Sequence, residues 1–129
     1  MNVALAGRSS VVGKPLAHML TAADATVTLC HTATKDTADI FRRSGMIVSA
    51  AGRAKWLKKE MIPNGAIIID VGTNLDDRGK MCGDADYDGV AAAAAAVTPV
   101  PGGVGPVTKA CLLEAAVKAA ERTITEVGL

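Results

Sequence analysis

Aromatic side chains are nearly absent from this sequence, which has one Phe, one Tyr and one Trp among its 129 residues. The core must therefore be aliphatic and rich in alanine, a composition that suits helices packed closely on a sheet. Basic runs are missing too, and the formal net charge is only +1. Without a strong positive field, or aromatic side chains to stack on bases, the chain lacks the usual features of nucleic-acid-binding proteins.

Paired cysteines are absent from the sequence: Cys30, Cys82 and Cys111 lie far apart and form no Cys-x-x-Cys pair. An odd number of cysteines at this spacing argues against a disulfide framework and against a thiolate zinc site. The two histidines, His18 and His31, have no metal-ligand spacing either. We therefore expect a reduced, cytoplasmic protein that binds no metal.

Long hydrophobic segments are also missing. The longest apolar run, residues 90–97, is mostly alanine and is far shorter than the roughly 18 residues that a membrane span needs. Residues 1–7 lack the basic start and the longer apolar stretch of a signal peptide. We expect no binding to membranes. We also expect a single domain over residues 1–129, because the length suits one domain and no linker or repeat divides it.

An acidic segment, residues 83–89, has the Asp-x-Asp-x-Asp-Gly pattern that opens a calcium-binding loop. The position that would need a bidentate Glu is occupied by Ala95. We therefore interpret this segment as a polar turn that leads into an alanine-rich helix.

Elsewhere, short apolar runs alternate with helical periodicity. Strands are predicted at residues 2–6, 26–31, 46–50, 66–71 and 97–100, and helices at about 12–23, 36–43 and 106–122. The strands are almost continuously apolar, which indicates burial on both faces and hence a parallel sheet covered by helices. This alternation predicts a doubly wound, Rossmann-like α/β fold, with a mainly parallel sheet and helices on both faces. Ligands of such folds bind at the carboxyl ends of the strands.

The turn after the first predicted strand, residues 7–13, combines small side chains with a helix N-terminus. Both features allow the backbone to approach and bind phosphate oxygens, as a dinucleotide-binding turn requires. Ser9 and Val12 stand where the usual fingerprint has its second and third glycines, and Gly13 comes one place late. A tight strand-to-helix turn without a ligand is therefore the alternative.

The end of the second predicted strand bears on the choice of cofactor. An NAD site places a carboxylate there for the ribose 2′-hydroxyl, but the first acidic residue is Asp36. Arg8, the Thr32 hydroxyl and, with less weight, Lys35 suit the 2′-phosphate of NADP, because a guanidinium binds phosphate through paired hydrogen bonds. Solvated surface charges are the alternative for Arg8 and Lys35.

Three glycines between prolines shape the segment at residues 98–108. Its stiff ends and bare backbone predict a loop on which a planar ligand can pack, followed by a helix that starts at Pro106. A simple connector is the alternative.

Taken in order, these segments resemble the C-terminal NAD(P)-binding domain of methylenetetrahydrofolate dehydrogenase/cyclohydrolase. The resemblance is carried by residues 7–15, 26–32, 69–74, 83–87 and 101–108. It implies an oxidoreductase of one-carbon metabolism that oxidises 5,10-methylenetetrahydrofolate and passes hydride to NADP. In many members a hydrolase activity then converts the methenyl product to 10-formyltetrahydrofolate.

The resemblance also implies roles for individual residues. Gly7, Arg8 and Ser9 would hold the cofactor phosphates, with Arg8 and Thr32 around the 2′-phosphate and Thr73 near the nicotinamide. The folate side of the cleft would be lined by Pro101, Gly102, Gly103, Val104 and Gly105.

The resemblance also implies that proton transfer depends on an N-terminal domain. That domain would supply a Tyr-x-x-x-Lys pair together with a Gln and an Asp. Here the one tyrosine, Tyr87, is followed four residues later by Ala91, so we assign no catalytic residue to this chain. We expect a cofactor domain that meets the folate substrate only together with the missing domain, as a fragment, a split gene product or half of a complex. The resemblance further implies a homodimer. A free-standing dinucleotide-binding or dimerisation module without catalysis is the alternative.

Overall fold

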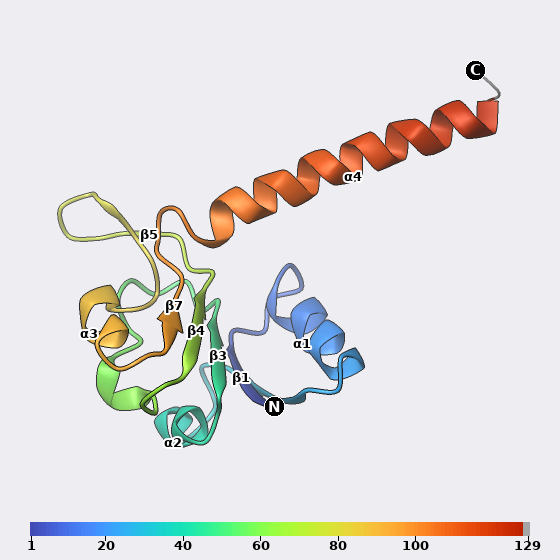
Figure 1. Cartoon of the computed structure of the whole chain (residues 1–129). Helices are drawn as coiled ribbons and strands as arrows, with labels where there is room; N and C mark the ends of the chain where they lie inside the picture. Colours follow the sequence, from blue (N-terminus) through green and yellow to red (C-terminus); the bar gives the residue numbers. More distant parts are fainter. Residues whose placement is uncertain (128–129) are drawn as a thin grey trace.

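Five short parallel strands form the central sheet of the computed structural model, which describes residues 1–127 (Figure 1). The strands are β1 (Asn2–Ala6), β2 (Thr26–Cys30), β3 (Met46–Ser49), β4 (Ile67–Asp70) and β7 (Ala96–Val97). Their order is β2-β1-β3-β4-β7, and every neighbouring pair is parallel. The order therefore reverses between β1 and β3, and doubly wound folds bind ligands at the carboxyl ends of the strands that flank such a reversal.

Helix α1 (Gly13–Ala22) covers one face of the sheet. Because side chains alternate along a strand, Val3 and Leu5 of β1 point to the same face. Leu16 and Leu20 are four residues apart on one side of α1, and they pack against the buried cluster of Val3, Leu5 and Val48.

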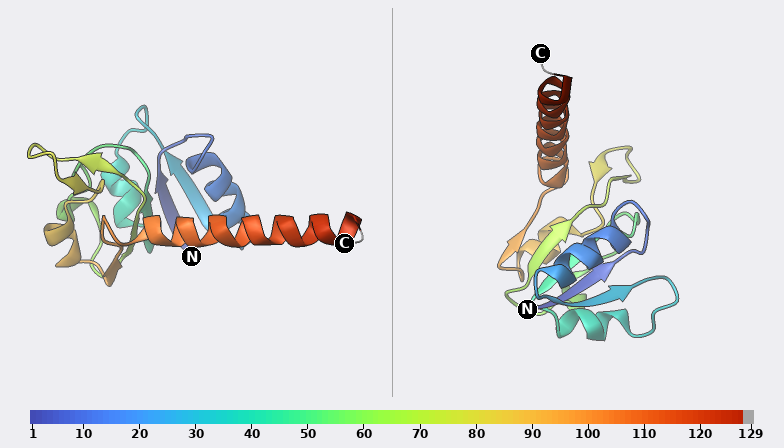
Figure 2. Two further views of the ribbon diagram at one scale, coloured as in Figure 1. Left: turned by 90° about the horizontal axis from the view of Figure 1, so that it is seen from above. Right: turned by 90° about the vertical axis from the view of Figure 1, so that its right-hand side faces the viewer.

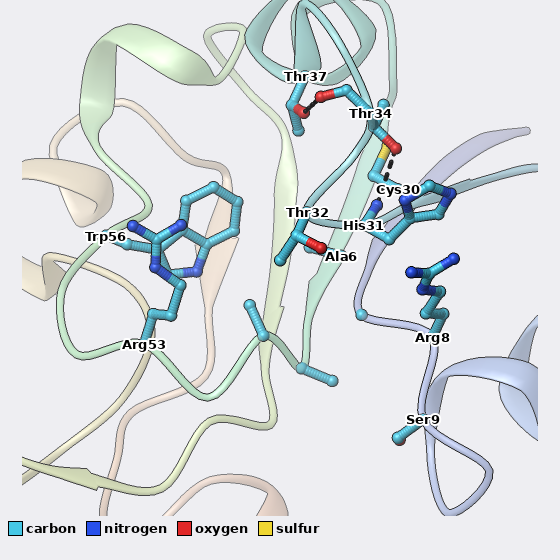
Figure 3. Close-up of a pocket in the computed structure, with 13 residues that line it drawn as sticks. Ala6, Arg8, Ser9, Cys30, His31, Thr32, Thr34, Thr37, Arg53 and Trp56 are labelled. Carbon is cyan, nitrogen blue, oxygen red and sulfur yellow. Dashed lines mark hydrogen bonds between the residues drawn. The ribbon is translucent and has the colours of Figure 1, made fainter.

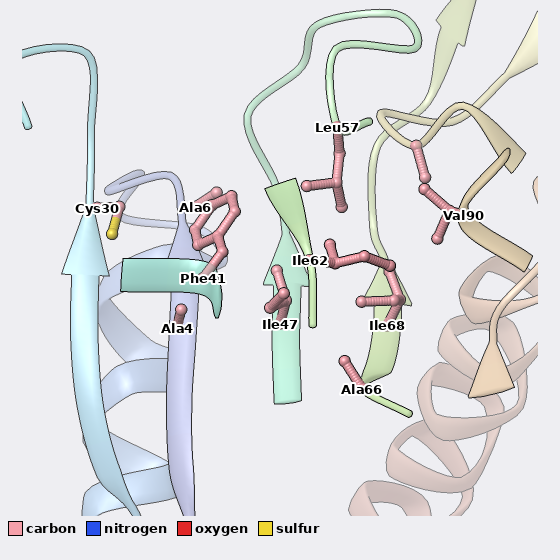
Figure 4. Packing of buried hydrophobic residues seen from close by; sticks show 11 residues of the cluster. Ala4, Ala6, Cys30, Phe41, Ile47, Leu57, Ile62, Ala66, Ile68 and Val90 are labelled. Carbon is pink, nitrogen blue, oxygen red and sulfur yellow. The ribbon is translucent and has the colours of Figure 1, made fainter. Parts of the chain in front are cut away.

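The opposite face carries α2 (Thr37–Arg42) and α3 (Tyr87–Ala91). Phe41 of α2 and Val90 of α3 are fully buried there, in a cluster that includes Ile47 and Ile68 of the sheet (Figure 4). The buried apolar residues are aliphatic apart from Phe41, Cys30 and Cys82, in line with the composition. Helices on both faces of a parallel sheet confirm the predicted fold class.

The strand predicted at residues 97–100 is wrong in extent. In the structure β7 is Ala96–Val97. Pro99 and Pro101 have no N–H group to donate to a neighbouring strand, so pairing cannot continue through them.

The alanine run is also less helical than predicted, because α3 ends at Ala91. Beyond it, the Ala95 N–H donates to the Ala66 carbonyl oxygen (2.9 Å), which draws the chain out of the helix and into β7. Three short elements were not predicted: the 3₁₀ helix η1 (Lys59–Met61) and the antiparallel strands β5 (Asn74–Leu75) and β6 (Met81–Cys82).

Helix α4 (Val104–Val127) leaves the sheet and projects away from the rest of the domain (Figures 1 and 2). It begins two residues before the predicted start at Pro106, because proline is tolerated throughout the first turn of a helix, where its missing N–H is not needed. Several of its apolar side chains are exposed, Leu112 and Leu113 among them. None of the described helices is long and apolar enough to cross a membrane.

Candidate functional site

A cavity of about 450 Å³ opens at the carboxyl ends of β1, β2 and β3, where the strand order reverses (Figure 3). Four of the residues predicted to bind the cofactor line it, namely Gly7, Arg8, Ser9 and Thr32. Lys35, the weaker candidate, is not among the lining residues. The volume lies within the roughly 300–1,000 Å³ of small-molecule sites.

Gly7 forms the corner between β1 and α1. Its φ of +118° lies in the region that favours glycine, and a Cβ at this position would overlap the carbonyl group of Ala50. The Gly7 N–H donates to the Cys30 carbonyl oxygen (2.9 Å) at the end of β2. The corner is therefore held against the ends of both neighbouring strands, with its backbone beside the cavity.

Ser9 caps the start of α1 from within the same corner. Its Oγ accepts hydrogen bonds from the N–H groups of Val12 (3.1 Å) and Gly13 (3.4 Å). A hydroxyl has two acceptor lone pairs and one donor hydrogen, so these bonds leave the O–H free to donate. A phosphate oxygen is a suitable acceptor for it, close to the positive end of the helix dipole.

The turn after β2 is fixed by its own side chains. Thr34 Oγ1 accepts from the His31 N–H (2.9 Å), and His31 Nδ1 accepts from the Ala33 N–H (3.2 Å). The exposed Thr32 lies between these bonds, and Figure 3 shows it lining the same cavity as Arg8. No acidic side chain is present among the described residues that line this cavity.

The other predicted site residues line a second cavity, of about 580 Å³. They are Thr73, which follows β4, and Pro101, Gly102, Gly103, Val104 and Gly105, which precede and begin α4. The loop is folded tightly, because a Cβ at Gly103 would overlap the Pro99 carbonyl oxygen. The structure thus divides the predicted residues into two groups, both at the carboxyl ends of parallel strands.

The loops around the two cavities are joined by Asp84, a carboxylate with no solvent exposure. Its two oxygens accept hydrogen bonds from Ser49 Oγ (2.9 Å), from the backbone N–H groups of Ala51 (2.7 Å), Gly52 (3.2 Å) and Arg53 (2.9 Å), and from Asn74 Nδ2 (2.9 Å). Gly72 is required beside it, because a Cβ there would overlap the carboxylate. The acidic segment at residues 83–89 therefore contains, besides the predicted polar turn, a buried carboxylate that holds neighbouring loops together through hydrogen bonds.

Asp70, at the end of β4, is a second buried carboxylate. It accepts backbone N–H bonds from Gly72 (2.9 Å), Asp84 (3.0 Å) and Ala85 (2.8 Å). Burial raises the pKa of Asp70 above its ordinary value, the three N–H bonds oppose that shift, and the nearby Asp84 charge adds to it.

We expect the contribution of Asp70 to stability to fall as pH rises. Since its pKa is raised on folding, the folded chain holds the proton more tightly than the unfolded chain between the ordinary and the raised pKa. Urea unfolding from pH of about 4 to about 7 should show wild type losing stability relative to Asp70→Asn, which cannot titrate. Parallel curves, or a relative gain for wild type, would contradict this expectation.

Arg53 and Trp56 also line the first cavity, although the sequence alone assigned neither of them a role. The Arg53 guanidinium carbon lies 5.7 Å from the centre of the Trp56 ring. The available signal was position, because Arg53 follows the end of β3 by four residues and so lies at the same edge of the sheet as Arg8. Within the described residues, no group of three or more His, Cys, Asp or Glu side chains is placed to hold a metal ion.

Several features now point to one class of protein. The parallel sheet reverses its strand order beside a glycine corner at a helix N-terminus, and a cavity without carboxylates opens at that point. Phosphate groups of nucleotides bind at such corners. The fold and the cavity define an α/β domain of the dinucleotide-binding class.

The chain belongs to the family of tetrahydrofolate dehydrogenase/cyclohydrolase NAD(P)-binding domains, whose model matches residues 1–124. It is 50% identical over 118 residues to the bifunctional protein FolD of Elusimicrobium minutum, and this match covers 92% of the chain but 41% of the relative. The FolD enzyme of Methylibium petroleiphilum is 52% identical over 118 residues, which cover 92% of this chain and 42% of that one.

Solved structures give the same result. The bifunctional FolD methylenetetrahydrofolate dehydrogenase/cyclohydrolase of Campylobacter jejuni superposes with a TM-score of 0.91 at 44% identity, covering 94% of this chain and 43% of that one. The Trypanosoma brucei methylenetetrahydrofolate dehydrogenase-cyclohydrolase, complexed with NADP and an inhibitor, superposes with a TM-score of 0.88 at 43% identity, covering 95% and 44%. The chain therefore spans less than half the length of these relatives.

Proposed function

We propose that this chain binds NADP in the first cavity and serves as the cofactor domain of a 5,10-methylenetetrahydrofolate dehydrogenase. The observation that carries the proposal is the cavity itself, in which Arg8 and Thr32 meet the glycine corner and no described lining residue is acidic. An NAD-specific site would place a carboxylate there for the ribose 2′-hydroxyl. The Trypanosoma brucei structure, which contains NADP, supports the same cofactor.

The second cavity suits the other end of the cofactor and the substrate. NADP, when bound, would supply the hydride acceptor, and Gly7, Arg8 and Ser9 would hold its phosphates. Thr73 would lie near the nicotinamide, and the loop at residues 101–105 would form the folate side of the cleft. Within this proposal the chain's residues bind and orient the cofactor. We also propose a reducing, cytoplasmic setting, because the odd number and wide spacing of the cysteines do not suit a disulfide framework.

The reaction needs more than this chain provides. The chain matches 41% of the length of the Elusimicrobium minutum relative, a bifunctional protein. We propose that the proton-handling groups and most of the folate site belong to a further domain. Dehydrogenase activity, and cyclohydrolase activity where present, would require that domain, because hydride transfer without an acid–base partner lacks transition-state stabilisation.

A second candidate function is assembly. Leu112, Leu113 and Val117 of α4 are 70%, 69% and 57% exposed, which is unusual for such side chains on a helix. This exposure favours a helix that is covered in the complete protein, either by a second copy in a homodimer or by another domain.

Titration calorimetry tests the proposal directly. The chain should bind NADPH more tightly than NADH. The second step adds to this chain the part of the Elusimicrobium minutum relative that lies outside the match. The mixture should form NADPH from NADP, and only when methylenetetrahydrofolate is present. Absence of binding to both nucleotides at millimolar concentrations would refute the cofactor assignment and leave the role in assembly.

A further inference from the structure

Arg53 is a second arginine that lines the first cavity, and the sequence pattern alone assigned it no role. Arg53 is carried by the loop after β3, and Arg8 by the loop after β1, the neighbouring strand. Figure 3 shows the two side chains on opposite sides of the cavity, with Thr32 between them. The Arg53 guanidinium lies over the indole ring of Trp56, 5.7 Å from its centre.

The backbone of Arg53 bonds to the buried carboxylate of Asp84 directly, and its guanidinium is connected to the same carboxylate through Trp56 and Ser49. Its backbone N–H donates to Asp84 Oδ1 (2.9 Å). At the other end, the guanidinium lies over Trp56, whose Nε1–H donates to Ser49 Oγ (3.3 Å), and Ser49 Oγ donates to Asp84 Oδ2 (2.9 Å). Trp56 is further fixed by an edge contact with Phe41, at 6.0 Å between ring centres. Arg53 is therefore more restricted than an ordinary surface arginine.

The charge of Arg53 is not neutralised by the protein. In the described part of the chain, the ion pairs within 4.0 Å involve Arg42, Lys55, Lys58 and Lys118, and neither Arg8 nor Arg53 has a carboxylate at that distance. The contact of the Arg53 guanidinium with the Trp56 ring is not a hydrogen bond, so it does not by itself occupy the N–H donors as a carboxylate partner would. Those donors are suited to the oxygens of a phosphate.

We propose that Arg53, supported by Trp56, is a second specificity-determining residue for the ribose 2′-phosphate of the cofactor and binds it from the side opposite Arg8. The proposal rests on the proposed function, because it takes the first cavity as the adenosine site. Because the contact with Trp56 restricts the side chain before the ligand arrives, less conformational entropy is lost on binding than for an arginine without that contact. The loop after β3 would then contribute to the preference for NADP over NAD as directly as the corner after β1.

The test uses two ligands that lack the nicotinamide half, so that only the first cavity is probed. Adenosine 2′,5′-bisphosphate carries the 2′-phosphate, and adenosine 5′-monophosphate does not. In titration calorimetry, Arg53→Gln should weaken binding of the bisphosphate by about ten- to a hundredfold and binding of the monophosphate by less than about threefold. Arg53→Lys should restore part of the loss, because it keeps the charge but not the paired donors.

Arg78→Gln is the matched control, because Arg78 is an exposed arginine that does not line this cavity. It should leave both affinities unchanged. A further variant, Trp56→Leu, keeps the Arg53 charge but removes its support, and should give a loss smaller than that of Arg53→Gln and again confined to the bisphosphate.

The outcomes separate this proposal from the proposed function. If wild type binds the bisphosphate and Arg53→Gln binds it equally well, the role of Arg53 is overturned and the cofactor site stands. Equal losses for both ligands would also overturn it, since Arg53 would then support only the adenosine. If wild type binds neither ligand, both the site and the role of Arg53 are wrong.

Discussion

Replacement of Arg8 with alanine is expected to weaken NADPH binding by about ten- to a hundredfold, and NADH binding far less. The two nucleotides differ only in the 2′-phosphate, so a residue that binds this group affects one and spares the other. Arg8 lines the cavity at the strand-order reversal, and it has no carboxylate partner within the described residues. A charge-assisted, paired hydrogen bond to phosphate is among the stronger polar contacts in proteins.

The measurement is titration calorimetry with each nucleotide at low and at high salt. Lys35→Ala is the control, because Lys35 is a nearby exposed cation that does not line the cavity. It should change neither affinity beyond the effect of salt screening. Equal losses for NADPH and NADH in Arg8→Ala would show that Arg8 contacts a part common to both nucleotides, and would refute the 2′-phosphate assignment.

The part of the site around Arg8 could be predicted because its components are close in sequence. A strand, a glycine and a helix N-terminus follow one another within residues 2–22, and local periodicity is enough to identify each of them. The same holds for the turn after β2 that contains Thr32. That these two corners meet followed from the parallel sheet, which was predicted from the apolar strands.

The roles of Arg53, Trp56 and Asp84 could not be assigned in this way, although the position of Arg53 after β3 places it at the ligand-binding edge of the sheet. Asp84 accepts from Ser49, 35 residues earlier in the chain, and this contact depends on how the hairpin of β5 and β6 returns to the sheet. The hairpin strands have two residues each, too few for a periodic pattern to be recognised. The Asp-rich sequence indicated solvent exposure, whereas five hydrogen-bond donors from distant segments make burial of Asp84 favourable.

The projecting helix α4 shows a different limit. Its sequence predicts a helix correctly, since helix formation depends on neighbouring residues. The surface against which a helix packs, however, can belong to another domain or another chain, and the local sequence pattern does not reveal it. The exposure of Leu112 and Leu113 indicates such a covering surface, which the sequence alone does not identify.

Asp84 is the residue whose loss should affect both cavities at once. We expect Asp84→Ala to lower the free energy of unfolding by about 3–5 kcal/mol, because its removal leaves buried donors without an acceptor. Domains of this size are stable by only about 5–15 kcal/mol, so the variant would lie close to unfolding. Asp84→Asn should be nearly as harmful, since its amide NH₂ would face donors that now bind a carboxylate oxygen.

Urea unfolding followed by circular dichroism measures this loss, with Asp86→Ala as the matched control. Asp86 is two residues away, its side chain is 43% exposed, and it forms a surface ion pair with Lys58. Pairs of that kind contribute about 0–1 kcal/mol, so the control should have nearly the same free energy of unfolding as wild type.

If Asp84→Ala were as stable as Asp86→Ala, water would be replacing the carboxylate. The loop that carries Arg53 would then be held by contacts other than Asp84. If Asp84→Ala is destabilised as expected but remains folded, NADPH affinity should fall as well, because the Arg53 N–H and the Ser49 hydroxyl that accepts from Trp56 both lose Asp84 as their acceptor.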